Sequence, residues 1–280
     1  MRRILAARLS RFTSLATPST TIDSGARLLG EAWFQHRRLS ELRAGSRPRN
    51  ADDAYACQDA LVSLLTEHYG GETIGYKIAC TNKIAQELLH MDGPFHGKLL
   101  SSFCFETPAR IEADGFFMRV MEAEFAFRMA RDLTPGARVP SREEVADAIE
   151  GVLPGIEIVD SRFEEWTTVG AESLIADNAC HAAWVRGALV TDWRKLDLAG
   201  QEVRLAVNGE AIQKGNGAAV LGHPLNAMHW LVGSLHSRGI ALKAGQYVTT
   251  GVTTDIYLGQ PGDRVRAEFG PVGAVELELI

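Results

Sequence analysis

The chain has 280 residues, of which 46% are hydrophobic and 23% are charged, and its formal net charge is −6 at pH 7. The absence of a basic excess argues against a nucleic-acid partner, because nothing would offset the phosphates. No apolar run reaches the roughly 18 residues of a membrane-spanning helix, so no membrane partner is expected. Four cysteines without CxxC spacing favour a reducing, cytoplasmic location over a disulfide framework or a zinc knuckle.

The first 22 residues differ in composition from the rest of the chain. They contain four arginines and several serines and threonines, and no acidic residue precedes Asp23. This composition favours a disordered extension or a start codon placed too early, with a mitochondrial transit peptide as the alternative. We expect residues 1–22 to be a basic, disordered extension and residues 23–280 to form a single catalytic domain.

Helical spacing dominates the region from Ala26 to about Tyr69, where apolar residues recur every three or four positions in two runs. Asn50 or Asp52 can cap the second helix, and Gly70-Gly71 ends it. Three further elements are expected before the middle of the chain. They are a strand over Ile74–Ala79, a helix over Lys83–Leu89 and a turn at Asp92-Gly93-Pro94.

The centre of the chain carries the sharpest pattern, a period-2 alternation over Met121–Met129 in which one face is apolar and the other holds Glu122, Glu124, Ala126 and Arg128. This alternation predicts a strand with one apolar face. Ser141 and Glu144 form a capping box that opens a helix through about Gly151. Pro154 is expected to end that helix before a strand over Ile156–Val159, and strand–helix–strand order suggests a crossover unit.

The second half is mostly β. Short apolar segments at 182–190, 202–207, 247–250, 264–269 and 273–279 are separated by turn residues, and one helix spans about Pro224–Ser237. The expected fold class is therefore α+β, with a β-rich core.

A carboxylate pair suggests a metal site. Glu122 and Glu124 are two apart on the predicted strand, so both side chains point to one face, with Cα atoms roughly 7 Å apart. Glu157 is a third candidate on the next strand. If that face is interior, the natural partner is a hard cation such as Mg²⁺ or Mn²⁺, which prefer oxygen ligands. The alternative is a solvated strand face neutralised by Arg128.

Two other polar features are open to more than one interpretation. Lys77 lies between apolar neighbours, and a half-buried lysine there could have a lowered pKa and transfer protons. It could equally be a surface lysine with a buried stem. The segment Asp177–His181 could bind an oxygenated substrate or supply turn and cap hydrogen bonds.

Seven segments in one order give the chain a family resemblance. They are Gly75–Thr81 (GYKIACT), Glu122–Phe127 (EAEFAF), Leu153–Arg162 (LPGIEIVDSR), Ala176–Ala179 (ADNA), Gly217–Ala227 (GAAVLGHPLNA), Leu242–Gly245 (LKAG) and Thr250-Gly251. Together they resemble the fumarylacetoacetate hydrolase superfamily, in its 2-oxopent-4-enoate hydratase and 4-oxalocrotonate decarboxylase branch.

This resemblance implies a fumarylacetoacetase-like mixed β roll with flanking helices, a homo-oligomer, and a Mg²⁺ or Mn²⁺ site. By position, Glu122, Glu124 and Glu157 match the metal ligands of the family and Lys77 matches its active-site lysine. Asp177 and Asn178 fall in the motif that lines the substrate pocket. The implied activity is hydration of a small 2-hydroxy-2,4-dienoate, the enol form of a 2-oxo acid, in aromatic catabolism.

One departure from the family pattern concerns the type of reaction. Hydratases of this branch carry an acidic residue just after the turn proline, whereas here Pro94 is followed by Phe95 and His96. An apolar residue is typical of the decarboxylases, which work in complex with a hydratase, and His96 is a candidate substitute acid or base. The alternatives are therefore a 4-oxalocrotonate-type decarboxylase, a C–C hydrolase of another 2-oxo acid, or a non-catalytic subunit. The three intact glutamates argue against the last.

Overall fold

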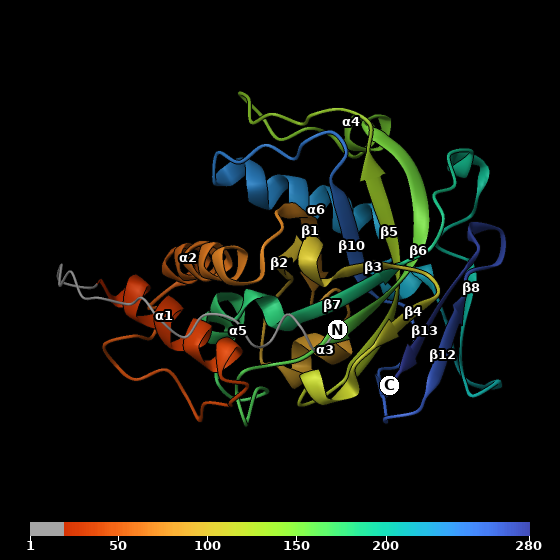
Figure 1. Cartoon of the computed structure of the whole chain (residues 1–280). Coiled ribbons are helices and arrows are strands. Elements are labelled where there is room, and N and C mark those ends of the chain that lie inside the picture. Colours follow the sequence, from red (N-terminus) through yellow and green to blue (C-terminus); the bar gives the residue numbers. More distant parts are fainter. Residues whose placement is uncertain (1–19) are drawn as a thin grey trace.

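The computed structural model describes residues 20–280, which form two curled sheets flanked by helices (Figure 1). This arrangement confirms the predicted α+β class. No helix within this range is long and apolar enough to cross a membrane. The helices are α1 (Thr21–Phe34), α2 (Ala51–Tyr69), α3 (Lys83–Leu88), α4 (Arg142–Asp147), α5 (Ala171–Ala176) and α6 (Pro224–Ser237).

The larger sheet has eight strands in the order β2-β1-β10-β5-β6-β7-β3, and β11 pairs with β5. Its members are β1 (Thr73–Ala79), β2 (Phe95–Leu100), β3 (Cys104–Glu106), β5 (Val120–Met129), β6 (Ile149–Val159), β7 (His181–Arg186), β10 (Tyr247–Val252) and β11 (Tyr257–Leu258). The smaller sheet has five strands in the order β4-β13-β12-β8-β9. They are β4 (Ala109–Ile111), β8 (Glu202–Val207), β9 (Glu210–Asn216), β12 (Arg264–Glu268) and β13 (Ala274–Leu279).

The apolar core lies between the two sheets. The alternating apolar residues of β5 point into it, as the pattern predicts, and the ring of Phe125 meets that of Phe269 at 5.0 Å between centroids. The other face of β5 is buried as well, since Glu124 and Ala126 are both 0% exposed. Glu124 is therefore inside the protein, which alternation alone did not reveal, whereas Glu122 and Arg128 on the same face are partly buried.

The predicted crossover between β5 and β6 is wrong. The two strands pair antiparallel over almost their full length, with Glu122 opposite Glu157. The helix α4 is short and ends at Asp147, so the chain turns back directly instead of crossing the sheet. The capping box of Ser141 and Glu144 is confirmed at its start.

Pro154 does not end a helix, because it lies within β6. Its carbonyl accepts a hydrogen bond from Gly187 N at 2.8 Å, just beyond the last residue of β7. In an antiparallel strand the nitrogen and carbonyl of one residue point to the same side. The missing N–H of Pro154 therefore falls where the β7 ladder has ended, the kind of position at which a strand tolerates proline.

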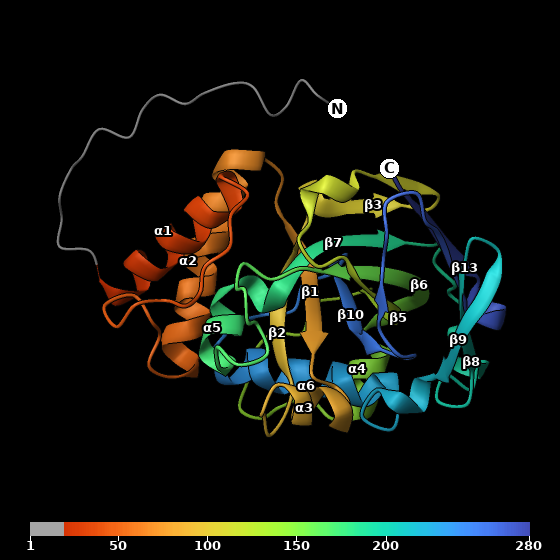
Figure 2. The ribbon, with the colours of Figure 1, turned by 90° about the horizontal axis from the view of Figure 1, so that it is seen from below.

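Two helices, α1 and α2, pack against each other on one side of the larger sheet (Figure 2). The Asn50 cap of α2 and its end at Gly70 are confirmed. Thr20 and Asp23 form a capping box at the start of α1, so Thr21 and Ile22 belong to this helix. The predicted boundary between residues 22 and 23 therefore falls inside α1, and the rest of the predicted extension lies outside the described residues.

The strands and the helix predicted in the second half are confirmed, although β7 ends at Arg186, before the predicted limit of residue 190. The elements that were missed are β2, β3, β4, β9, β11 and the short helix α5. β9 is an edge strand in which each residue is exposed or only partly buried, so it carries no apolar alternation. β2 is buried on both faces and contains His96, Gly97 and Lys98, which interrupt an apolar pattern. Its strand pairing comes from β1 and not from local sequence.

Candidate metal centre

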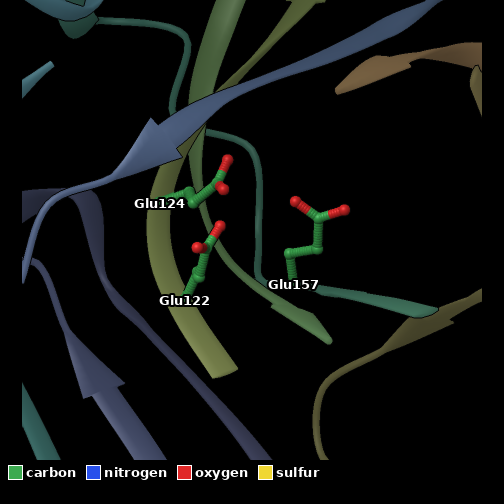
Figure 3. A group of neighbouring side chains, drawn as sticks. All are labelled: Glu122, Glu124 and Glu157. Carbon is green, nitrogen blue, oxygen red and sulfur yellow. The ribbon is translucent and has the colours of Figure 1, made fainter. Parts of the chain in front are cut away.

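Three glutamates from two strands converge on one point inside the larger sheet. Glu122 and Glu124 lie on β5, Glu157 lies on β6, and one carboxylate oxygen from each lies within 4.8 Å of the other two. Figure 3 shows the three carboxylates turned toward one another. Glu124 and Glu157 are 0% exposed, so the alternative of a solvated strand face is wrong. Arg128 does not neutralise the group, because it pairs with Glu150.

The chemistry of this group fits a hard divalent cation. Burial raises the pKa of Glu122 to about 7, although Lys77 acts in the opposite direction. Burial and the neighbouring carboxylates raise the pKa of Glu124 well above its usual range. Within residues 20–280, Glu124 Oε1 is a buried oxygen without a hydrogen-bond partner. Mg²⁺ and Ca²⁺ accept such oxygen ligands.

Neighbouring groups orient two of the three carboxylates. Glu124 Oε2 accepts hydrogen bonds from Thr249 Oγ1 and, at 2.8 Å, from Gly251 N, both on β10. Glu157 Oε1 lies 2.9 Å from His181 Nδ1, and its Oε2 lies 3.2 Å from Lys77 Nζ. Partners of this kind hold ligating side chains in place around protein metal sites.

His181 is a site residue that sequence reasoning missed. It lies at the start of β7 and is 1% exposed. Its contact with Glu157 depends on the pairing of β6 with β7, which shifts register beside this residue. The polar segment Asp177–His181 was the available signal, but nothing in the sequence revealed which member faces the glutamates.

Lys77 is part of the site and is not a surface lysine. Its side chain is buried, and Nζ donates a hydrogen bond to the Ala179 carbonyl at 2.9 Å. The expectation of a lowered pKa is wrong. Burial alone would lower the pKa of Lys77, but the surrounding glutamates, Glu157 foremost, raise it above its usual range. The surrounding carboxylates therefore favour the charged form of this lysine.

Asp177 and Asn178 lie on the turn between α5 and β7, beside Lys77. Asp177 Oδ2 accepts hydrogen bonds from Ser161 Oγ at 3.1 Å and from Arg162 N at 2.8 Å. The amide of Asn178 bonds the backbone of Lys98. Both side chains thus bond other parts of the protein, and their predicted role in substrate binding stays a prediction.

Phe95 and His96 are both buried, but His96 faces away from the glutamates. It pairs with Ile78 across the β1–β2 ladder, whereas the next residue, Gly97, pairs with Lys77. Because side chains alternate along a strand, His96 and Lys77 point to opposite faces. The His96 ring stacks on Tyr55 at 4.3 Å, and burial lowers its pKa to about 3. This orientation argues against His96 as a substitute acid or base.

Comparison with known proteins supports the same assignment. The family model described as fumarylacetoacetate (FAA) hydrolase C-terminal matches residues 106–279, which is more than half of the chain. The chain belongs to the fumarylacetoacetate hydrolase family. The resemblance seen in the ordered segments is thereby confirmed.

Several curated members of this family are similar over nearly the whole chain. The 2-hydroxyhexa-2,4-dienoate hydratase of Comamonas testosteroni is 35% identical over 261 residues, covering 92% of this chain and 97% of that protein. The 2-keto-4-pentenoate hydratase of Paraburkholderia xenovorans (strain LB400) is 32% identical over 260 residues, covering 92% and 94%. The 4-oxalocrotonate decarboxylase of Pseudomonas putida is 28% identical over 229 residues, covering 81% and 85%.

A solved structure shares the fold of this family member. The 4-oxalocrotonate decarboxylase from Pseudomonas putida G7, complexed with magnesium and adipate, superposes with a TM-score of 0.85 at 26% sequence identity. The match covers 96% of this chain and 100% of that chain. The predicted fumarylacetoacetase-like arrangement of sheets and flanking helices is therefore confirmed.

Proposed function

We propose that this family member is a Mg²⁺- or Mn²⁺-dependent hydro-lyase that adds water to 2-hydroxy-2,4-dienoates in aromatic-compound catabolism. The observation that carries the proposal is the buried group of Glu122, Glu124 and Glu157 with Lys77 beside it. Two curated hydratases of dienoic or pentenoic 2-oxo acids, at 32% and 35% identity, support the same reaction class.

The residues of the site divide into holding and proton-transfer roles. The three glutamates would hold the cation, which when bound supplies Lewis-acid stabilisation of negative charge on a 2-oxo acid. Lys77 Nζ holds a proton at the edge of this site, where it can donate to a carbon or oxygen of the substrate and take the proton back. His181 and Thr249 keep Glu157 and Glu124 in position for both steps.

A second candidate is decarboxylation of a 4-oxalocrotonate-type diacid. The observation that favours it is Phe95, which is 3% exposed and packs in an apolar cluster with Ala179 and Cys180, beside the lysine. An acidic residue cannot be accommodated in that packing without a large desolvation cost. The magnesium and adipate complex of a decarboxylase with this fold is in keeping with a six-carbon diacid.

The assembly and location of the protein are part of the same proposal. Exposed apolar side chains on β9 and around β11, among them Ile212 and Leu258, support a homo-oligomer. A decarboxylase would be expected to act in complex with a hydratase. Four cysteines, all unpaired, support a reducing cytoplasmic location, with the mitochondrion as the alternative from the basic N-terminus.

The test measures the absorbance of 2-hydroxypenta-2,4-dienoate with the full chain, first with added Mg²⁺ or Mn²⁺ and then with a chelator. A hydratase gives fast, chelator-sensitive loss of absorbance and a 4-hydroxy-2-oxo acid as product. A decarboxylase leaves this substrate intact and releases carbon dioxide from a 4-oxalocrotonate-type diacid. Turnover that persists undiminished in chelator would contradict both candidates.

A further inference from the structure

The turn that joins α5 to β7 has an unusual backbone. Three consecutive residues, Asn178, Ala179 and Cys180, have φ values of 50°, 54° and 58°. Residues other than glycine seldom adopt this left-handed conformation, and a run of them persists only where surrounding structure enforces it. The middle residue offers its carbonyl to Lys77 Nζ at 2.9 Å. The strained turn thus carries a contact of the active-site lysine.

The carboxamide of Asn178 attaches this turn to the sheet. Asn178 Oδ1 accepts a hydrogen bond from Lys98 N at 2.7 Å, and Nδ2 donates one to Lys98 O at 2.9 Å. Lys98 lies on β2, the terminal strand of the larger sheet, so among residues 20–280 its outward backbone groups have no neighbouring strand. The side-chain amide pairs with them as the peptide group of another strand would.

Gly97 gives the turn room to approach β2. A Cβ atom at this position would lie 2.3 Å from the Asn178 carbonyl oxygen, well inside contact distance. Gly97 is also the ladder partner of Lys77. The turn therefore sits directly over the strand pair that carries the lysine, at a place where no side chain separates them.

We propose that Asn178 is a positioning residue for Lys77. Its two hydrogen bonds to Lys98 fix the turn, the turn fixes the Ala179 carbonyl, and that carbonyl holds the ammonium group in reach of Glu157. This inference rests on the proposed function, because it assigns Asn178 a role through the lysine of that site. It differs from the family-based prediction, in which Asn178 contacts substrate.

The matched variants are Asn178→Gly and Asn208→Gly. Asn208 also has a positive φ, 53°, and its carboxamide likewise makes two hydrogen bonds, with Arg264 N at 2.9 Å and Asp263 Oδ1 at 3.0 Å. It lies between β8 and β9 in the other sheet. Glycine adopts positive φ without strain, so each substitution removes the side-chain bonds and leaves the backbone free to keep its conformation.

Kinetics of dienoate turnover distinguish the two roles. For Asn178→Gly we expect kcat to fall about tenfold to hundredfold, the effect of misplacing a catalytic group by about 1 Å. KM should stay within about twofold, because no substrate contact is lost. Asn208→Gly should change neither constant by more than about twofold. A higher KM with unchanged kcat in Asn178→Gly would make Asn178 a substrate-binding residue and overturn the proposal.

A second measurement does not depend on activity. Urea unfolding of Asn178→Gly, Lys77→Met and the double variant gives a coupling between the two residues. We expect the change in the unfolding constant of this double variant to differ from the product of the two single changes by about threefold or more. For the control double variant of Asn208→Gly and Lys77→Met, the change should equal the product of the two single changes. Independent effects at Asn178 and Lys77 would overturn the proposal even in an active enzyme. Coupling in a protein without dienoate activity would leave the proposal standing and reject the hydratase assignment.

A third variant covers the case in which Asn178→Gly does not fold. Asn178→Asp tolerates positive φ, keeps the acceptor for Lys98 N and loses the donor to Lys98 O. The expected change is again a lower kcat with KM within about twofold of the original value, smaller than that of the glycine variant. An unchanged kcat in this variant, once folded, would count against a positioning role.

Discussion

The two ends of the β5–β6 ladder carry the same kinds of residue in opposite environments. At one end Glu122, Glu124 and Glu157 are packed together with a single lysine against them. At the other end Arg128 and Glu150 form an ion pair at 2.8 Å, with side chains 37% and 35% exposed. One end gathers like charges inside the protein, and the other pairs opposite charges at its surface.

The difference is that the glutamate end carries a free-energy cost that the exposed end does not. Burying carboxylates beside one another costs free energy, and the raised pKa values of Glu122 and Glu124 express that cost. The exposed pair contributes little in either direction, because solvent screens it. Such a cost is retained where a ligand of opposite charge offsets it, which is why the four predictions below contrast the two ends.

The largest effect is expected for Glu124→Gln. Glutamine keeps an acceptor for Gly251 N but lacks the charge that holds a cation, whose Lewis-acid contribution is worth several kcal/mol. Turnover of the dienoate should fall by about a thousandfold or more. The control is Glu150→Gln on the same ladder, which should leave turnover unchanged. Full activity in Glu124→Gln would remove the metal centre from the mechanism.

Lys77→Met should have the next largest effect on catalysis. Methionine fills much of the same volume without a proton to transfer, and loss of general acid or base catalysis costs about 100-fold or more in kcat. Breaking the buried pair with Glu157 should also destabilise the metal-free protein by about 3–5 kcal/mol in urea unfolding. The matched control is Lys195→Met, at an exposed lysine, which should change neither kcat nor the free energy of unfolding. A fully active Lys77→Met would reject proton transfer by this lysine.

Added Mg²⁺ should raise the melting temperature of the unaltered protein. A cation at about 100 times its dissociation constant stabilises the folded state by about 2.7 kcal/mol, or roughly 5–10 °C in a chain of this size. In Glu124→Gln this shift should vanish, and the metal-free variant should melt no lower than the original, because a buried charge has been removed. Differential scanning calorimetry measures both. If Mg²⁺ raised the melting temperature of the unaltered protein and of Glu124→Gln equally, the cation would bind at another site.

The smallest effect is expected at the exposed end. Arg128→Ala should lower the free energy of unfolding by at most about 1 kcal/mol, and high salt should reduce the difference further. Dienoate turnover should be unaffected. A large loss of stability on urea unfolding would show that the Arg128–Glu150 ion pair contributes substantially to the free energy of unfolding.

Local signals predicted the elements that depend on neighbours in the chain. The caps at Asn50 and Ser141, the end of α2 at Gly70 and the alternation of β5 are set within a few residues, and each was confirmed. Two of the failures, at β2 and at Pro154, depend on distant partners, whereas β9 pairs with the adjacent β8 across the Asn208-Gly209 turn, a local signal that was overlooked. β2 is a strand because β1 pairs with it, and Pro154 is tolerated because the β7 ladder ends beside it.

The sequence by itself determined which residue types the site could use, because ordered motifs with three glutamates and a lysine are a local property of the chain. It did not determine that Glu124 and Glu157 are buried, that Lys77 is buried against Glu157, or that His181 contacts Glu157. Those facts depend on which strands pair and in what register, and on how the sheets close over them. Burial and charge coupling arise from contacts between segments far apart in the chain, so only the tertiary structure decided them.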